Sequence, residues 1–425
     1  MELVPRAATE QLADAVQDLR VTVVNGPRQA GKTTLLEMFQ AAHGGTYRSL
    51  DGAEELAAAL GDPVAYVDSG ERPLIIDEVQ RGGERLILAV KRSVDQNRTP
   101  GQFVLAGSTR FLTVPTLSES LAGRAAFVDL WPLSMTERTC GGEDFLQTGL
   151  GRPAELVGDT SPWTRDDYLE LITTGSFPEV IGMRNNSSRR RWFNGYLRTI
   201  IERDITEFAD IRHAQALPRL AAMIAARAGS PFVASDVGNG LSLPGETIRT
   251  YLKYLETVFL TASAPAWSTN LVTRLTKAPK VFLTDSGVAA NLTNTDIDTL
   301  RRPGHRSLGA LTETFVFAEL LKLKSLTCDA FEIMHYRDRD GREIDFILET
   351  PDGRIYAIEV KASSSPHSDD TRHLTWLRDK LGDRFTAGIV LHLGTKGFSY
   401  GDRILSLPLS ALWGHAPLRS DIVQQ

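Results

Sequence analysis

Short apolar runs alternate with helical stretches over about the first 135 residues of the 425-residue chain. All but one of the candidate strands are almost entirely apolar, as expected where helices cover both faces of a parallel sheet. The strands are expected at Val21–Asn25, Tyr47–Leu50, Pro73–Asp77, Phe103–Ala106 and Ala126–Leu130. This alternation predicts an α/β unit with a parallel sheet.

The pattern then breaks between residues 141 and 163, where Gly, Pro, Asp and Ser predict a linker or a surface excursion. The stretch from Tyr168 to about Arg227 has a helical pattern. A short helix after Pro231, a turn at Ser242–Gly245 and a helix over Glu246–Phe259 are expected next. The last helix carries apolar residues at a 3.6-residue period, namely Ile248, Leu252, Leu255 and Phe259.

Beyond Lys280 a second α/β unit is expected, because helices again alternate with strands. The predicted helices are Leu311–Lys324 and one around Arg372–Lys380; the predicted strands are Glu332–Tyr336, Glu343–Glu349, Arg354–Lys361 and Thr386–Leu393.

Composition excludes several classes of protein. Hydrophobic residues make up 42% of the chain and charged residues 24%, which is ordinary for a globular protein. No apolar run approaches the ~18 residues that span a bilayer, and the N-terminus lacks a secretory pattern, so no membrane partner is expected. Two distant cysteines, Cys140 and Cys328, provide neither a disulfide framework nor a cysteine zinc site. A reducing cytoplasm is therefore the expected compartment.

The net charge of −6 argues against a protein that coats nucleic acid with its whole surface. A local basic segment exists, because six arginines against one glutamate lie between Arg184 and Arg203. Two interpretations stay open for it: cations that face phosphates, or a solvated helix face.

The strongest motif is Gly26-Pro27-Arg28-Gln29-Ala30-Gly31-Lys32-Thr33, which fits GxxxxGK[ST] and stands between a Val-rich strand and a helix. In such a loop the backbone N–H groups and the helix N-terminus surround phosphates. Lys32 is expected to contact the β- and γ-phosphates of ATP, and the Thr33 hydroxyl to bind Mg²⁺. The expected nucleotide-binding segment extends to Thr34.

Further candidate catalytic residues follow later strands. Asp77 and Glu78 end a buried strand, where Asp77 is expected to hold Mg²⁺ and Glu78 to act as the general base on water. Ser108 ends another strand and is expected to sense the γ-phosphate or position water, unless it is only a polar strand end. Arg124 is either an arginine finger toward a neighbouring subunit, which implies a homo-oligomer, or an exposed surface arginine.

These motifs resemble a known family. GPRQAGKTTL, PLIIDEVQ, FVLAGSTRFL, SLAGR, LWPLSMTE and GSFPEV follow one another in the first half, and YLKYLE, KVFLTDSG, LTETFV, GREIDF and IEVKAS in the second. In this order they resemble AAA-type ATP-binding proteins whose C-terminal half is described as domain of unknown function 4143. The resemblance runs from about Val21 to Trp413. It implies an ATPase core, a helical lid, a winged helix and a nuclease-like tail.

The tail carries two carboxylates and a lysine in a suggestive arrangement. Glu359 and Lys361 share one face of a strand, and Asp345 on the preceding strand is expected to reach them across the hairpin. PD-(D/E)xK nucleases use such a set, with Asp345 and Glu359 on Mg²⁺ and Lys361 positioning the nucleophile. Glu313 or Glu319 is expected to add a ligand. An inert scaffold of the same fold is the alternative.

In the predicted winged helix, Thr247, Arg249, Thr250 and Lys253 are expected on the exposed side of the recognition helix, facing phosphates and bases of DNA. Residues Thr261–Asn270 are the expected wing. The alternative is a winged helix that packs against the ATPase core or a protein partner, which Glu256 on the same helix favours.

The expected architecture is therefore α/β, with a P-loop AAA-type ATPase core over residues 1–150, a helical lid over 151–216, a winged helix over 217–275 and a PD-(D/E)xK nuclease-like domain over 276–425. The leading hypothesis is a Mg²⁺-dependent ATPase that rearranges or cleaves DNA, branched DNA included. The alternative is a nucleotide-driven switch that acts on a protein partner through an inert nuclease-like scaffold, as in signalling or toxin–antitoxin systems.

Overall fold

The computed structural model describes residues 4–109, 121–139, 153–206, 208–209, 211, 213–302, 304–327 and 331–419. Cys140, Cys328 and residues 141–152 of the predicted linker lie outside these ranges. The chain divides into two compact units. Unit 1 comprises residues 1–133 with 257–259, and unit 2 comprises residues 134–256 with 260–425.

Unit 1 is built on a five-stranded parallel sheet in the order β2-β3-β4-β1-β5. The strands are β1 (Val21–Asn25), β2 (Thr46–Ser49), β3 (Leu74–Asp77), β4 (Phe103–Gly107) and β5 (Ala125–Asp129). All five predicted strands exist, and no strand end differs from its predicted position by more than one residue. The predicted parallel α/β sheet is thus confirmed.

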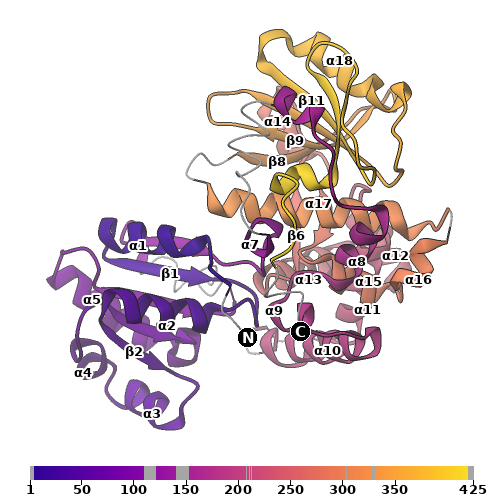
Figure 1. The fold of residues 1–425 in the computed structure, drawn as a ribbon. Coiled ribbons are helices and arrows are strands. Elements are labelled where there is room, and N and C mark those ends of the chain that lie inside the picture. Colours follow the sequence, from indigo (N-terminus) through magenta and orange to yellow (C-terminus); the bar gives the residue numbers. More distant parts are fainter. Residues whose placement is uncertain are drawn as a thin grey trace. The chain divides into compact units, whose positions relative to one another are not determined.

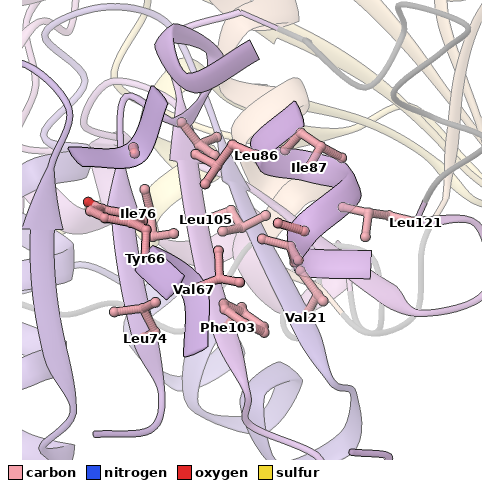
Figure 2. Close-up of a cluster of buried hydrophobic side chains, with 14 of the residues drawn as sticks. Val21, Tyr66, Val67, Leu74, Ile76, Leu86, Ile87, Phe103, Leu105 and Leu121 are labelled. Carbon is pink, nitrogen blue, oxygen red and sulfur yellow. The ribbon is translucent and has the colours of Figure 1, made fainter. Parts of the chain in front are cut away.

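Helices cover both faces of this sheet. α1 (Ala8–Asp18) and α2 (Lys32–His43) contact one another and the strands on one side. α3 (Ala53–Gly61), α4 (Pro63–Asp68) and α5 (Gly83–Gln96) pack on the other, with a short 3₁₀ turn at Val79–Gly82. Alternate residues of the strands form a continuous core with this second group, as Figure 2 shows for Val21, Leu74, Ile76, Phe103 and Leu105. The period-2 geometry of strands therefore gives both faces an apolar surface to bury.

The first part of unit 2 is mainly helical. A stretch predicted as helical from Tyr168 to about Arg227 is interrupted after Thr174 and again after a π-helical turn at Ile200–Asp204. The helices are α7 (Met135–Arg138), α8 (Arg165–Thr174), α9 (Pro178–Ile181), α10 (Asn186–Thr199), α11 (Ala216–Ala226), α12 (Ala234–Leu241), α13 (Gly245–Thr257), α14 (Leu271–Thr276), α15 (Ser286–Leu292) and α16 (Ile297–Arg301). β6 (Thr261–Ala264) and β7 (Lys280–Leu283) form an antiparallel pair after α13.

The second part of unit 2 is a mixed six-stranded sheet in the order β12-β13-β11-β10-β9-β8. Figure 1 labels its strands β8, β9 and β11. Its strands are β8 (Glu332–Arg337), β9 (Glu343–Glu349), β10 (Ile355–Lys361), β11 (Phe385–His392), β12 (Phe398–Ser399) and β13 (Ile404–Pro408). The long helix α17 (Ser307–Leu326) precedes it, and α18 (Arg372–Leu381) packs on β9, β10 and β11. Short 3₁₀ turns lie at Pro153–Gly158, Ser368–Thr371, Gly382–Arg384 and Leu409–Trp413.

Stacked aromatic rings join the two parts of unit 2. Phe282 of β7 stacks on Phe317 of α17 at 4.5 Å between ring centroids, and both rings contact Phe346 of β9. Strand β7 therefore lies against the same helix and strand that carry the carboxylates of the nuclease-like motif. Within the described ranges, no helix is long and apolar enough to cross a bilayer.

Candidate nucleotide-binding site and carboxylate cluster

The phosphate-loop motif forms a tight turn between β1 and α2. Gly31 adopts φ +96°, a left-handed conformation that favours glycine, immediately before α2 begins at Lys32. At Gly26 a Cβ atom would lie 2.1 Å from the carbonyl oxygen of Leu130, so only glycine allows this approach. The loop is thus held where its N–H groups and the N-terminus of α2 converge.

Lys32 lies inside this loop. Its side chain is only 6% exposed, and its Nζ donates hydrogen bonds to the carbonyl oxygens of Gly26 at 2.9 Å and Pro27 at 2.8 Å. These two bonds hold a cation within the turn, where a polyphosphate would meet it.

The two predicted Mg²⁺ ligands lie in contact. Thr33 Oγ1 donates to Asp77 Oδ2 at 2.7 Å, and the Tyr47 hydroxyl donates to the same oxygen at 3.2 Å. Burial raises the pKa of Tyr47, and the charge of Asp77 adds to the shift, so the phenol stays protonated and donates. A hydroxyl and a carboxylate are hard oxygen ligands of the kind Mg²⁺ takes. These residues therefore fit the ion, which would neutralise phosphate charge.

Glu78 is held just beyond Asp77 in an unusual backbone conformation. Its φ is +52°, a left-handed value that is costly for a residue with a Cβ, and Asp77 Oδ1 accepts its N–H at 2.9 Å. Gln80 Nε2 donates to Glu78 Oε2 and lies 3.4 Å from Ser108 Oγ. Burial raises the pKa of Glu78, and Lys32 partly opposes that rise. A carboxylate with a raised pKa is a better acceptor for a proton from water.

The order of the strands in the sheet determines the position of Ser108 in the site. β4 lies between β1 and β3, so the residue after β4 lies between the phosphate loop and the Asp77–Glu78 pair. Ser108 is buried and shares Gln80 with Glu78. The structure therefore brings together Lys32, Thr33, Asp77, Glu78 and Ser108, as the sequence predicts.

Arg124 does not join this group within the chain. It precedes β5, and its carbonyl oxygen accepts the N–H of Val21 at the start of β1, the end of that strand opposite to the phosphate loop. Its guanidinium pairs with Asp95 at 2.7 Å. Arg124 therefore lies away from the phosphate loop of its own sheet, and its role as a finger toward another subunit stays a prediction.

Three residues of the site were missed by the sequence analysis. Tyr47 and Gln80 contact Asp77 and Glu78 as described above. Arg6 donates from Nη1 to the Ala30 carbonyl and from Nη2 to the Trp131 carbonyl, both at 2.6 Å, and so ties the phosphate loop to the chain after β5. Only Gln80, two residues beyond Glu78, offered a signal in the sequence.

The predicted carboxylate–lysine set in unit 2 is also assembled. β9 and β10 pair antiparallel up to Phe346 opposite Ile358, so Asp345 and Glu359 follow as neighbours. Lys361 Nζ lies 2.8 Å from Glu359 Oε1. Burial and the charge of Asp345 raise the pKa of Glu359 to about 8.

The helix contribution comes from Glu313 and not from Glu319. Glu313 of α17 lies near Asp345, and burial together with that carboxylate raises its pKa well above the usual range. Glu319 instead pairs with Lys322 at 2.7 Å and accepts the N–H of Met135 at 2.8 Å. The two glutamates differ in surroundings because six residues along an α-helix correspond to about one and two-thirds turns, which directs Glu319 to another face than Glu313.

A lysine that the sequence analysis did not consider lies among these carboxylates. Lys280 Nζ is 3.0 Å from Asp345 Oδ1, 3.0 Å from Glu343 Oε1 and 3.8 Å from Glu313 Oε2. In the described part of the chain, no group of three or more His, Cys, Asp or Glu residues is arranged to hold a metal ion. Asp345 Oδ1 accepts from Lys280 and Asp345 Oδ2 accepts from the Val360 N–H, so both oxygens are already engaged. With Lys280 in this position, the set does not fit the Mg²⁺ expected on Asp345 and Glu359.

Helix α13 presents its predicted faces. Ile248, Leu252 and Leu255 are buried, whereas Arg249 and Lys253 are exposed. Thr247 and Thr250 are half-buried, and the Thr250 hydroxyl donates to the carbonyl of Glu246 at 3.2 Å. The helix ends before Phe259, whose φ of +60° is not helical.

The wing was predicted over Thr261–Asn270, and within that range only the strand β6 forms. Its antiparallel partner β7 lies after residue 275, where the predicted winged helix ends.

Several arginines of the basic segment have partners inside the protein. Arg189 pairs with Glu170, Arg190 Nη2 donates to Asn294 at 2.6 Å, and Arg198 pairs with Glu202 at 2.8 Å. These contacts favour the interpretation of the segment as a solvated helix face over cations that face phosphates.

Comparison with known families gives the class of the protein. Residues 18–139 match a family model described as an AAA domain. Residues 165–299 and 308–412 match models described as domains of unknown function, DUF8612 and DUF4143. The chain thus joins an AAA domain to a DUF4143 domain, and the resemblance seen in the motifs is confirmed.

Similar whole proteins are known. Uncharacterized proteins of Mycobacterium bovis and Mycobacterium tuberculosis are each 27% identical over 405 residues, covering 95% of this chain and 83% of the relative. Among solved structures, a Walker-type ATPase of Pyrococcus abyssi is 15% identical with a TM-score of 0.41, covering 68% of this chain and 96% of its own. The RuvB Holliday junction branch migration motor of Thermotoga maritima is 17% identical with a TM-score of 0.27, covering 62% and 90%.

Proposed function

We propose that the protein is a Mg²⁺-dependent ATPase whose hydrolysis cycle drives its action on DNA. The observation that carries the ATPase part is the contact between Thr33 and Asp77, with Glu78 next to them and Lys32 inside the loop. In this assignment Lys32 binds the β- and γ-phosphates, Thr33 and Asp77 hold the ion, and Glu78 accepts a proton from the attacking water.

Phosphate release from purified protein with ATP and Mg²⁺ tests this assignment. Turnover is expected in the wild type and is expected to be lost in Lys32→Ala, which removes the cation from the loop. An equal rate in both proteins would show that the phosphate loop is not the site of hydrolysis.

The DNA part rests on α12 and α13. Three residues join these two helices, which is the turn length of a helix-turn-helix, and the antiparallel pair of β6 and β7 follows α13, as a wing would. In this winged-helix assignment Arg249 and Lys253 face DNA phosphates or base edges from the exposed side of α13.

An electrophoretic mobility shift at graded salt tests the DNA part on duplex, single-stranded and junction DNA. The double variant Arg249→Ala with Lys253→Ala is expected to weaken binding and to lower the salt slope by about 2, since each phosphate contact adds close to one. The matched control is Arg219→Ala with Arg227→Ala, which removes two exposed cations from α11 and its end. An equal loss in both double variants, or no binding of any DNA, would refute the role of α13.

A second candidate is a nucleotide-driven switch that acts on a protein partner through an inert nuclease-like scaffold. The position of Lys280 among the carboxylates favours this candidate over DNA cleavage. Both candidates include ATP hydrolysis, and nicking of supercoiled DNA with Mg²⁺ tests whether the nuclease-like domain cleaves DNA or is an inert scaffold. Nicking that Asp345→Ala abolishes would support cleavage, whereas the absence of nicking in both proteins would support the scaffold.

A further inference from the structure

Lys280 is a fully buried lysine at the first position of β7. Its side chain is 0% exposed, and its ammonium group is directed at carboxylates from α17 and β9. Burial lowers the pKa of this lysine, but the charges of Asp345, Glu313 and Glu343 outweigh that effect and raise the pKa overall. The amine is therefore charged, and this cation holds the carboxylates together.

Both oxygens of Asp345 have partners in this arrangement. Oδ1 accepts from Lys280 Nζ at 3.0 Å, and Oδ2 accepts from the Val360 N–H at 3.0 Å. The buried oxygens Glu313 Oε2 and Glu359 Oε2 have no hydrogen-bond donor in the described structure. The ammonium group of Lys280 thus binds Asp345, while one oxygen each of Glu313 and Glu359 has no hydrogen-bond donor in the described structure.

The backbone also closes one side of the cluster. Gly229, in the segment after α11, has φ +84°, and a Cβ there would lie 2.3 Å from Glu313 Oε2. Glycine therefore allows the chain to pack directly on the Glu313 carboxylate. Substrate has no approach to Glu313 from that side.

We propose that the ammonium group of Lys280 is a built-in replacement for a divalent cation, and that the cluster of Glu313, Glu343, Asp345 and Glu359 becomes a divalent-cation site when this amine is removed. Lys361 does not fill the same place, because it is partly exposed and pairs with Glu359. This inference concerns unit 2 alone and does not depend on ATP hydrolysis.

The physical reason is charge compensation. Carboxylates taken out of water require a counter-charge, and removing one partner of such a group leaves an uncompensated buried charge. Lys280→Ala removes the amine and most of the side-chain volume, which leaves room for an ion with its bound waters. Carboxylate oxygens are the ligands that hard divalent cations prefer.

The experiment is a titration of the full-length protein with Mn²⁺ in the absence of nucleotide. Calorimetry measures the affinity for Mn²⁺, and thermal denaturation measures the Tm at each Mn²⁺ concentration. In Lys280→Ala we expect Mn²⁺ to raise the Tm by several degrees and to bind at least about tenfold more tightly than in the wild type, because an ion that binds only the folded state stabilises it. Asp345→Asn added to Lys280→Ala is expected to abolish the gain. The matched control is Lys322→Ala, which removes another buried lysine that pairs with the carboxylate of Glu319.

Three results would overturn the proposal: no gain of Mn²⁺ binding in folded Lys280→Ala, an equal gain in Lys322→Ala, or wild-type Mn²⁺ binding that Asp345→Asn removes. The comparison of the wild type with Asp345→Asn keeps Lys280 in both proteins. It can therefore refute the proposal even if Lys280→Ala does not fold. ATP turnover of the same samples tests the proposed ATPase separately.

Discussion

Replacing Glu78 with glutamine separates nucleotide binding from hydrolysis. The amide keeps an oxygen that accepts from Gln80, and the backbone bond from Glu78 N–H to Asp77 Oδ1 is unchanged. The substitution therefore removes the proton acceptor while it leaves the geometry of the site intact. Loss of a general base costs about 10²–10⁴ in rate, or about 3–5 kcal/mol of activation free energy.

Burial predicts a second effect of the same change. The site already disfavours the charged form of Glu78, which is why its pKa is raised. A neutral amide avoids that desolvation cost, so the Tm of Glu78→Gln is expected to equal or exceed that of the wild type. Loss of activity without loss of stability distinguishes a catalytic role from a structural one.

The assay is steady-state phosphate release together with ATP affinity from calorimetry. Glu78→Gln is expected to bind ATP with a Kd close to that of the wild type and to turn over at least about a hundredfold more slowly. Glu84→Gln, an exposed glutamate in the first turn of α5, is the control and is expected to change neither quantity. Turnover of Glu78→Gln at the wild-type rate would refute the assignment of the base.

Further predictions concern the remaining ligands, the pH dependence and the core. Lys32→Ala is expected to lose ATP binding measured by calorimetry, since it removes the cation held by the loop carbonyls. Thr33→Val is expected to retain ATP but to need several-fold more Mg²⁺ for turnover, because it removes the hydroxyl paired with Asp77; an unchanged Mg²⁺ requirement would exclude Thr33 as a ligand. Burial lowers the pKa of His392 from 6.5 to about 4. The unfolded chain therefore takes up a proton below pH 6.5 while the folded protein does not. Stability is then complete above pH 6.5 and falls by up to about 3 kcal/mol toward pH 4. His392→Asn should lose less over that range in urea denaturation, and an equal loss would contradict the shift. Phe103→Ala is expected to cost unit 1 about 3–5 kcal/mol by the same method, because this ring is fully buried in its core.

The elements of unit 1 were predictable because their signals are local. A run of apolar residues that ends in Asp77 and Glu78 specifies a buried strand with polar groups at its carboxyl end, and the structure has that strand. The loop before Lys32 needs glycine at positions of close approach or positive φ, and the motif states where they are. In the second sheet of unit 2, the edge strand β12 and its neighbour β13 were not predicted; β12 has only two residues, too few to carry a pattern.

The helix α17 shows the limit of pattern alone. Its buried residues occur on every side, so the periodicity does not say which face meets the sheet. Only packing decides that Glu313 lies among the carboxylates while Glu319 pairs with Lys322. Sequence spacing alone would have allowed Glu319 as readily as Glu313 to join the carboxylates.

The sequence by itself determined the phosphate loop, the Asp77–Glu78 pair and the exposed face of α13, since each depends on residues close together in the chain. Tertiary structure decided what lies against them. It placed Arg6 on the phosphate loop and Arg124 at the opposite end of β1. It also brought Lys280 across 65 residues to Asp345. Chain spacing carries no information about such contacts, because they arise only when distant elements are packed to bury their apolar faces, and the charges they enclose must then find partners wherever the fold provides them.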